Sequence, residues 1–242
     1  MGSNQLIINL ENISFTYPNR APVLDELTLR LSKGERLGLV GPNGSGKTTL
    51  FHIIMGLLKP CSGRIEILGR PVTREKDFRE VRKKIGLLFQ DADDQLFSPT
   101  VLEDVAFGPL NLGKSHQEAR DISVSTLKML GLGGLVDRIT YNLSGGEKRL
   151  VSLATVLAME PEALLLDEPS NGLDDDTKEK LIDVLSGLDL SYILITHEAD
   201  FLAKTVDHTC RMEDGKILTD HESYLHYHLH EHEQGKYPHK HE

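Results

Sequence analysis

The stretch GPNGSGKT, residues 41–48, decides the fold of this 242-residue chain. It occupies every fixed position of the phosphate-binding loop G-x-x-x-x-G-K-[ST]. An apolar segment, residues 37–40, precedes it, and a segment of helical character, residues 49–58, follows it and stops before Pro60. This strand–loop–helix setting suits phosphate, because the glycines let backbone N–H groups turn inward and the helix N-terminus favours an anion. The residues expected to line the phosphates of a nucleotide are Gly41, Pro42, Asn43, Gly44, Ser45, Gly46, Lys47, Thr48 and Thr49.

Within this loop, two side chains have separate expected tasks. Lys47 is expected to reach the β- and γ-phosphates, and the Thr48 hydroxyl to hold Mg²⁺. A plain glycine-rich turn would explain the glycines but not the lysine and threonine at their fixed positions.

Composition sets limits on the kind of protein. The formal net charge is −10, which argues against nucleic acid as a partner. Cys61 and Cys210 lie far apart and match no metal or redox motif, so we expect a reducing compartment. No stretch approaches the roughly 18–20 apolar residues of a membrane span, and residues 1–3 lack a signal-peptide pattern. We therefore expect a soluble protein whose role at a membrane is peripheral.

The order of apolar segments predicts an α/β nucleotide-binding core with a helical insert. The expected strands lie within residues 6–40 and at 65–67, 85–89, 163–166 and 192–196. The expected helices lie at 115–130, 145–159 and 177–188, and the segment from about 98 to 160 is helical in pattern. We predict one domain over residues 1–218, with its helical subdomain at about 98–160, and a histidine-rich tail over residues 219–242.

Two adjacent acids, Asp167 and Glu168, follow the most apolar of the predicted strands, residues 163–166. Ligands of open α/β sheets sit at the carboxyl ends of the strands. Asp167 is placed to hold Mg²⁺, and Glu168 to polarise an attacking water. Two solvated acids at a strand end are the alternative, which the phosphate loop in the same chain makes the weaker interpretation.

Residues 143–147, LSGGE, open a predicted helix. Ser144 and Glu147 form the S-x-x-E pattern of a capping box. A cap does not explain Gly145 and Gly146, since each glycine weakens a helix by up to ~1 kcal/mol relative to alanine. Two glycines make sense where an anionic phosphate must approach the positive helix end closely.

Taken together, these motifs resemble those of the ATP-binding-cassette (ABC) ATPases, from about Ile8 to Gly215. The resemblance rests on the phosphate loop, the 143–147 signature, the Asp167-Glu168 strand, residues 172–174 and His197 after its strand, all in family order. It implies a P-loop NTPase fold of the ABC type, with an antiparallel β subdomain and a helical insert. Glu147 departs from the usual glutamine of the signature, and Ser170-Asn171 from a commoner Thr-Ala or Thr-Ser.

The resemblance also implies a role for each motif residue. Two subunits would pair head to tail, and the signature of one would cover ATP on the phosphate loop of the other. Because every motif is intact in this chain, a homodimer would have two competent sites. Catalytic roles are implied for Glu168 as general base, His197 at the γ-phosphate, Gln90 as nucleotide sensor, and Lys47. Further ATP contacts are implied for Tyr17 on adenine, Ser144, Gly145 and Gly146 in the signature, and Asp174 between the two sites. Mg²⁺ would be held by Thr48, Gln90 and Asp167.

A narrower resemblance covers residues 90–97 and 100–109. It is to the ATPase component of energy-coupling-factor (ECF) importers, especially the cobalt/nickel branch. It implies an integral membrane coupling protein and a substrate-binding membrane subunit as partners, at the cytoplasmic face of the cell membrane. Asp91, Asp93 and Asp94 would then face basic side chains of the coupling protein. A solvated acidic loop is the alternative, and it stays open.

The tail supplies the hint about cargo. Seven of the eleven histidines fall within residues 219–242, among them His226, His228, His230 and His232. On a helix each of the pairs 226/230 and 228/232 would share a face, and on a strand all four would line one face. Imidazole binds Ni²⁺, Co²⁺ and Zn²⁺, so we predict weak binding of a divalent metal by these four histidines. A polar tail without function is the alternative. Three further functions stay open: a vitamin importer of the same group, an ABC ATPase with no transporter, and a metal buffer with a vestigial cassette.

Overall fold

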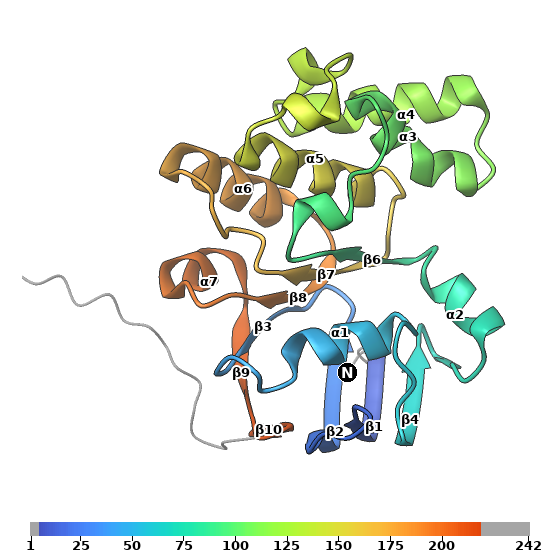
Figure 1. The fold of residues 1–242 in the computed structure, drawn as a ribbon, viewed down its shortest axis with the longest axis vertical. Helices are drawn as coiled ribbons and strands as arrows, with labels where there is room; N and C mark the ends of the chain where they lie inside the picture. The colour runs from blue at the N-terminus through green and yellow to red at the C-terminus, as the bar shows by residue number, and fades with distance from the viewer. Residues whose placement is uncertain (1–4, 219–242) are drawn as a thin grey trace, which may run out of the picture.

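The computed structural model describes residues 5–218, which form two sheets and a helical layer (Figure 1). The strands are β1 Leu6–Thr16, β2 Pro22–Ser32, β3 Arg36–Val40, β4 Ser62–Ile67, β5 Arg70–Pro71, β6 Ile85–Leu88, β7 Ala163–Asp167, β8 Ser191–Ile195, β9 His208–Glu213 and β10 Lys216–Leu218. The α-helices are α1 Lys47–Ile54, α2 Glu75–Val81, α3 Val101–Asn111, α4 His116–Met129, α5 Gly145–Leu157, α6 Asp175–Gly187 and α7 Ala199–Thr205. Short 3₁₀ turns lie at Ala92–Asp94, Gly133–Leu135 and Thr140–Asn142.

The larger sheet has the order β10-β9-β3-β8-β7-β6. Its strands β9, β3, β8, β7 and β6 run parallel to their neighbours, and β10 pairs antiparallel with β9. Parallel strands are covered on both faces, which fits the unbroken burial of β6, β7 and β8. The carboxyl ends of these strands therefore meet along one edge of the sheet.

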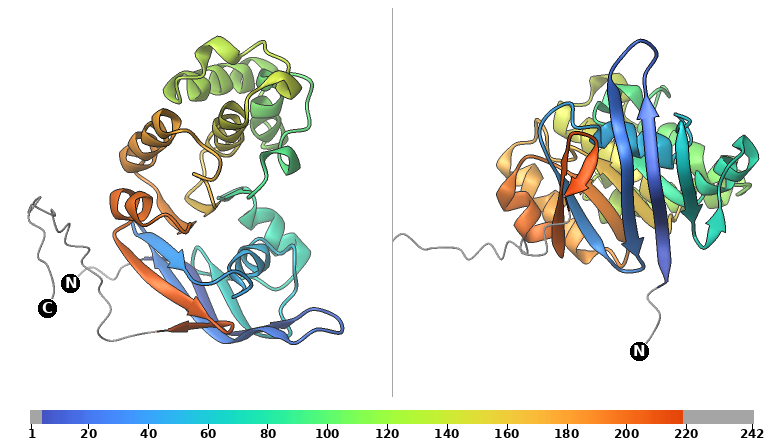
Figure 2. Two further views of the ribbon diagram at one scale, coloured as in Figure 1. Left: turned by 60° about the vertical axis from the view of Figure 1, so that its left-hand side comes forward. Right: turned by 90° about the horizontal axis from the view of Figure 1, so that it is seen from below.

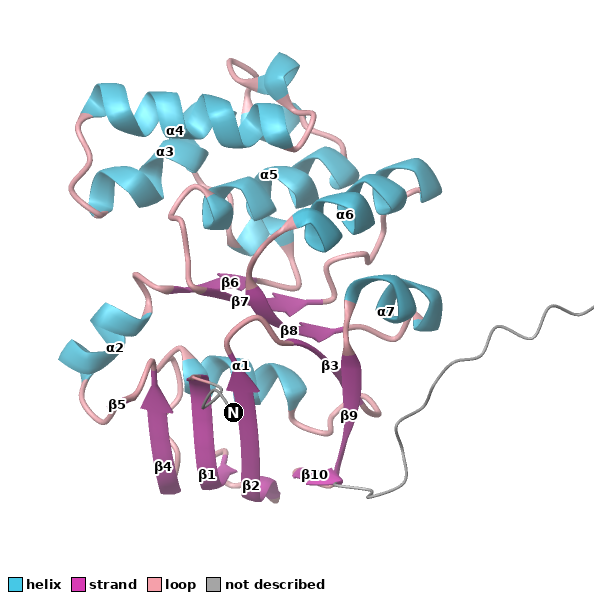
Figure 3. Ribbon diagram, turned by 180° about the vertical axis from the view of Figure 1, so that it is seen from behind, coloured by secondary structure: helices cyan, strands magenta, loops and turns pink. Residues whose placement is uncertain are grey.

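The smaller sheet is antiparallel, with the order β2-β1-β4-β5. Helix α1 lies between the two sheets, as the view from behind makes plain (Figure 3). Its side chains Leu50, Phe51, Ile53 and Ile54 are completely buried in a core shared by both sheets. The phosphate loop at the start of α1 is therefore seated on the central core of the molecule.

Helices α3, α4, α5 and α6 form a layer over the other face of the larger sheet (Figure 2). A second apolar core joins α5 and α6 to β6, β7 and β8. Helix α5 lies so close to β6 that a Cβ on Gly86 would stand 2.1 Å from Cγ1 of Val156. The helical layer is thus packed directly onto the strands whose ends carry the polar residues.

The predicted fold class is confirmed, and most predicted elements are present within one to four residues of their expected ends. The expected helix over 49–58 begins at Lys47 and ends at Ile54, and the helix expected from Thr177 begins at Asp175 because Asp174 caps it. The sequence patterns did not reveal α2, α7, β5, β9 or β10. No helix among residues 5–218 has the length and apolar character needed to cross a membrane.

Candidate nucleotide-binding and catalytic site

The phosphate loop runs from the end of β3 to the start of α1. Gly44 and Gly46 have left-handed backbone angles, φ 82° and 105°, that favour glycine. A Cβ on Gly41 would lie 2.1 Å from the carbonyl oxygen of Met212 in β9. The glycines are therefore needed for the turn and for its close approach to β9.

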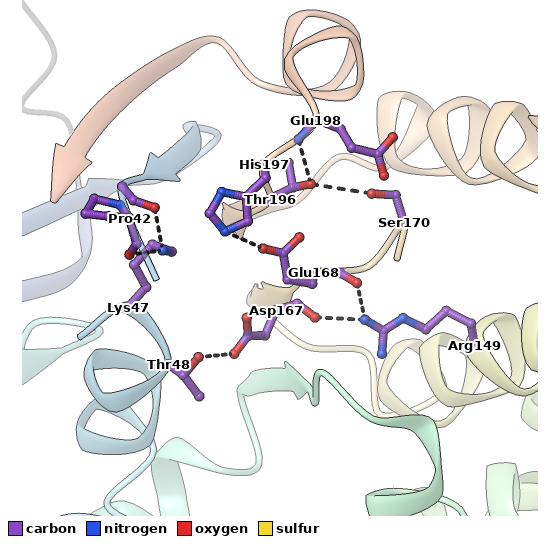
Figure 4. A network of polar contacts seen from close by, with 11 residues as sticks. Pro42, Lys47, Thr48, Arg149, Asp167, Glu168, Ser170, Thr196, His197 and Glu198 are labelled. Atoms are coloured by element: carbon purple, nitrogen blue, oxygen red, sulfur yellow. Dashed lines mark hydrogen bonds and ion pairs between the residues drawn. The ribbon is translucent and has the colours of Figure 1, made fainter. Parts of the chain in front are cut away.

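Two polar groups in the loop, the Lys47 ammonium group and the Ser45 hydroxyl, are suited to bind an anion. Lys47 is 7% exposed, and its ammonium group donates to the carbonyls of Gly41 (2.8 Å) and Pro42 (3.0 Å); Figure 4 shows the contact with Pro42. Burial lowers the pKa of Lys47, against the opposing effect of Glu168 and Asp167. The Ser45 hydroxyl is buried without a hydrogen-bond partner in the described chain. A buried hydroxyl without a partner is costly unless a ligand accepts from it, so the loop fits phosphate oxygens.

Thr48 and Asp167 meet at the end of β7. The Thr48 hydroxyl donates to Oδ2 of Asp167 over 2.8 Å (Figure 4). Burial raises the pKa of Asp167, and the hydrogen bond from Thr48 and the charge of Arg149 oppose this rise. A hydroxyl and a carboxylate side by side are hard oxygen donors of the kind that Mg²⁺ prefers. Gln90 lines the same two cavities as Thr48 and Asp167. The oxygen atoms of these three side chains therefore suit the predicted binding of Mg²⁺.

Glu168 follows Asp167 in a left-handed conformation, with φ 48°. This angle is uncommon for a residue with a Cβ and is often found at functional sites. Oε1 of Glu168 lies 3.3 Å from Nε2 of His197, which follows β8 (Figure 4). Burial raises the pKa of Glu168, whereas His197 and Thr196 lower it. A carboxylate whose pKa moves toward neutrality is better matched to proton transfer at neutral pH.

A cavity of about 430 Å³ joins these groups. Its polar lining comprises Tyr17, Arg20, Asn43, Gly44, Gly46, Lys47, Thr48, Thr49, Gln90, Asp167, Glu168 and His197. At one end the Tyr17 hydroxyl lies 3.2 Å from the Thr49 hydroxyl, and the Arg20 guanidinium lies 5.9 Å from the centre of the Tyr17 ring. A second cavity of about 710 Å³ shares Thr48, Gln90 and Asp167 and reaches Gly145 of the signature. The phosphate loop and the predicted catalytic residues therefore surround one space.

Most residues of the signature, 143–147, lie away from the two cavities. Ser144 and Glu147 form the predicted capping box of α5, with Glu147 N–H donating to Ser144 Oγ over 3.2 Å. Nothing lies within 4 Å of a Cβ built on Gly145, so packing inside the chain does not require a glycine there. Ser144, Gly146 and Asp174 line neither of the two cavities. Their predicted contact with ATP thus needs a second subunit, and it stays a prediction.

Asp174 and the acidic loop have local partners. Asp174 accepts from the N–H of Thr177 (2.9 Å) and from its hydroxyl (2.8 Å), and these bonds lower the pKa of Asp174. Asp91 accepts from the N–H of Asp93 (2.9 Å), and Asp93 pairs with Lys148 (2.6 Å). Two of the three acids after Gln90 are therefore already engaged within the chain, and docking on basic side chains stays a prediction for this loop.

Sequence reasoning missed Arg149, Gln95 and Arg20. Arg149 is 4% exposed and Gln95 is partly buried. The available signal was the arginine at the start of the run Leu150, Val151, Ser152 and Leu153, all buried on α5. A charged residue in such a run needs partners, but the sequence does not say which. The predicted tail ligands His226, His228, His230 and His232 lie outside the described residues.

Comparison with known proteins shows the family to which the chain is similar. The sequence profile of the family described as "ABC transporter" matches residues 24–171. A protein of Nitratidesulfovibrio vulgaris named as an ABC transporter ATP-binding protein is 52% identical over 236 residues, covering 97% of this chain and 86% of its own length. The cobalt import ATP-binding protein CbiO of Rhodobacter capsulatus is 43% identical over 219 residues, covering 88% of this chain and 78% of its own.

Solved structures agree with the sequence comparison. The structure of cbiO1 from Clostridium perfringens, described as part of the ABC transporter complex cbiONQ, has a TM-score of 0.80 and 35% identity, covering 88% of this chain and 87% of its own. A dimeric ATP-binding cassette in a post-hydrolysis state bound to ADP and Pi has a TM-score of 0.79 and 27% identity, covering 87% and 96%. This chain belongs to the ABC transporter family as an ATP-binding protein, an ATPase whose hydrolysis of ATP is coupled to transport.

Proposed function

We propose that this chain is the ATPase subunit of an ECF-type importer and that its cargo is a nickel or cobalt ion. The observation that carries the ATPase part is the single cavity in which Lys47, Thr48, Asp167, Glu168 and His197 meet. The importer type is supported by the 43% identity to a cobalt import protein and by the likeness to cbiO1. The proposal of a metal cargo is also supported by the histidines of the tail.

In the proposed mechanism the phosphate loop binds the ATP phosphates and Glu168 takes a proton. Lys47 would exchange its bonds to the Gly41 and Pro42 carbonyls for bonds to phosphate oxygens. Mg²⁺ held by Thr48, Asp167 and Gln90 would neutralise phosphate charge. Glu168 would orient the attacking water and accept its proton, and His197 would donate to the γ-phosphate. The contact between His197 and Glu168 holds both side chains on the same side of the cavity.

We further propose that two copies pair head to tail. The signature of each copy would cover the ATP of the other, with Ser144, Gly145 and Gly146 at the positive end of α5. The open space around Gly145 supports this arrangement, because no group of the same chain fills it. Asp174 would lie between the two sites.

A membrane partner is proposed for the surface next to the Gln90 loop. Phe97 and Phe107 are 66% and 50% exposed and form an edge-to-face pair with ring centres 4.8 Å apart. An exposed aromatic pair of this kind is typical of an interaction surface. The integral membrane coupling protein would dock there, which puts this chain at the cytoplasmic face of the membrane.

The experiment that tests the cargo is the nickel, cobalt and zinc content of source cells, measured by elemental mass spectrometry in metal-limited medium. Wild type would be compared with a deletion and with a variant truncated after Thr219. Loss of nickel or cobalt in the deletion supports the proposal, and the truncation reports whether the tail histidines matter. Unchanged metals in the deletion contradict the metal cargo and favour a vitamin importer.

Isolation from native membranes tests the importer itself. The proposal expects the chain to co-purify with an integral membrane protein. A chain that leaves the membranes without any such protein, yet hydrolyses ATP, would be an ABC ATPase that acts outside a transporter.

A further inference from the structure

Arg149, one turn into the signature helix α5, binds five backbone carbonyl groups. Its Nε donates to Pro169 O (3.1 Å), Nη1 to Gln90 O (3.0 Å) and to Phe89 O, and Nη2 to Asp167 O (2.8 Å) and to Glu168 O. A guanidinium group has five N–H donors, so every donor of Arg149 has a carbonyl partner. Figure 4 shows the side chain reaching from α5 to the Asp167–Glu168 segment.

The position of this guanidinium is costly unless its bonds are kept. Arg149 is 4% exposed, and none of the ion pairs of the described chain includes it. The carbonyl groups are therefore its direct partners, and the nearby carboxylates of Asp167, Asp91 and Glu168 stabilise the charge without a direct contact. Any displacement of these carbonyls would leave a buried charge with fewer partners, which strongly favours one arrangement of the five carbonyls.

The five carbonyls belong to the two segments that carry the predicted catalytic groups. Phe89 and Gln90 follow β6, and residues 167–169 end β7 and follow it. Arg149 therefore fixes the main chain on both sides of Glu168 and at Gln90 itself.

Gln95 also connects the segment after β6 to helix α5. Its Oε1 accepts from the N–H of Phe89 (3.2 Å), and its Nε2 donates to Ser152 O and to the Thr155 hydroxyl (both 2.8 Å) in α5. The peptide groups of Phe89 are thus held at both N–H and C=O by contacts that lead to α5. Helix α5, the Gln90 segment and the Glu168 segment form one hydrogen-bonded unit.

We propose that Arg149 is a positioning residue for ATP hydrolysis, which holds Glu168 and Gln90 in register with the signature helix, with Gln95 as its supporting partner. The inference rests on the role proposed for Glu168. It adds a connection within one chain between the signature, which would cover one ATP, and the groups that act on the other ATP. Movement of α5 would then change the position of the general base directly.

The substitution Arg149→Lys tests this inference. Lysine keeps the charge but has three donors in place of five, so part of the carbonyl set is released. A displacement of about 1 Å at reacting groups costs about a hundredfold in rate, and we expect the turnover number to fall 10- to 100-fold. The affinity for ATP should change less than about threefold, because none of the five hydrogen bonds of Arg149 goes to the phosphate loop.

Three measurements separate positioning from mere stability. ATP affinity is measured by titration with a fluorescent ATP analogue, turnover by phosphate release, and folding by thermal unfolding. Gln95→Leu should lower turnover by a smaller factor, and the double variant should lose less than the product of the two, because the residues act as a unit. Arg36→Lys is the matched control, since Arg36 also donates to carbonyls, of Ser186 and Leu188, on another part of the fold.

Unchanged turnover in a folded Arg149→Lys variant would overturn the inference. So would an equal loss of ATP affinity and turnover, which would indicate a general loosening of the site. Glu168→Gln is measured alongside. Normal turnover in Glu168→Gln refutes the proposed function, whereas an inactive Glu168→Gln with a normal Arg149→Lys refutes only the role of Arg149.

Discussion

The two walls of the nucleotide cavity are held in place by different means. The phosphate wall, residues 41–49, is shaped by its own glycines and by Lys47, which binds carbonyls of the same loop. The catalytic wall, made of Gln90, Asp167, Glu168 and His197, consists of the ends of three strands and is tied to the helical layer through Arg149. The phosphate wall is therefore held largely by contacts within its own loop, whereas the catalytic wall depends on hydrogen bonds from helix α5.

This difference leads to separable effects. Substitutions in the phosphate wall should change affinity, and substitutions in the catalytic wall should change turnover at nearly constant affinity.

The largest effect is expected for Glu168→Gln. Loss of a general base lowers turnover by about 10²- to 10⁴-fold, and glutamine keeps the size of the side chain. ATP affinity should stay within about threefold of wild type, and an ATP-bound dimer should accumulate in size-exclusion chromatography with light scattering. Glu162→Gln, on the surface beside Lys84, is the control and should turn over normally. Near-normal turnover in Glu168→Gln would remove the catalytic wall from the comparison.

Lys47→Ala should act on the other wall. Loss of charge-assisted hydrogen bonds costs about 1.5–3 kcal/mol, which corresponds to about 10- to 150-fold weaker binding of ATP. Titration with a fluorescent ATP analogue measures this change, with Lys33→Ala as an exposed control. Unaltered affinity together with lost turnover would mean that the two walls are not separable at Lys47.

Gly86→Ala tests the packing between α5 and β6. The new Cβ would stand 2.1 Å from Val156 Cγ1 and 3.0 Å from Leu164 Cδ2, so the Val156 side chain, or α5 with it, must move. We expect a destabilisation of about 1–3 kcal/mol and a several-fold loss of turnover at unchanged ATP affinity. Gly187→Ala is the matched control, since nothing lies within 4 Å of its Cβ. The second substitution Val156→Ala should restore turnover, and failure to do so would weaken the link between α5 and the catalytic wall.

The smallest effect is expected at an ion pair away from both walls. His208 Nε2 lies 2.8 Å from Glu35 Oε1. This hydrogen bond raises the pKa of His208; at Glu35 burial favours a higher pKa, but the bonds from His208 and Ser32 lower the pKa overall. The contribution of His208 is complete below its ordinary pKa of 6.5 and is lost as the pH rises through the raised value. That of Glu35 is complete above 4.5 and is lost as the pH falls through the lowered value.

The pair therefore stabilises most between about pH 4.5 and 6.5. His208→Asn should lower the free energy of unfolding by up to about 1 kcal/mol at pH 5.5 and by less at pH 9, measured by urea unfolding. ATP affinity and turnover should be unchanged. A change in turnover would show that β9 reaches the catalytic wall.

The conformation of the phosphate wall follows largely from the sequence, because most of its features depend on neighbours in the chain; the contacts of Gly41 with Met212 and of Thr48 with Asp167 do not. Glycine angles, the lysine and the first helical turn all lie within residues 41–49. The capping box of α5 was predicted for the same reason, since Ser144 and Glu147 are three residues apart. Features that depend on neighbouring residues can therefore be predicted from the sequence.

The catalytic wall was predicted only in part. Asp167, Glu168 and His197 could be placed at strand ends, but their mutual contacts depend on strand order, which residue patterns do not supply. Arg149 was missed because its partners lie 59, 60 and 18–20 residues away and are carbonyl groups, which every residue possesses. Strand β9 was missed because its burial shows no regular period, and β10 because it has only three residues.

The seating of the phosphate loop against β9 has a consequence for synthesis of the chain. Strand β3 pairs with β8 and β9, both of which are translated more than 150 residues later. At about 5–20 residues per second, the strand that leads into the phosphate loop waits roughly 10–35 s on the ribosome for its neighbours. A nascent chain therefore carries the complete loop sequence long before the strands that flank β3 are available, so we expect nucleotide binding only after β9 has been translated.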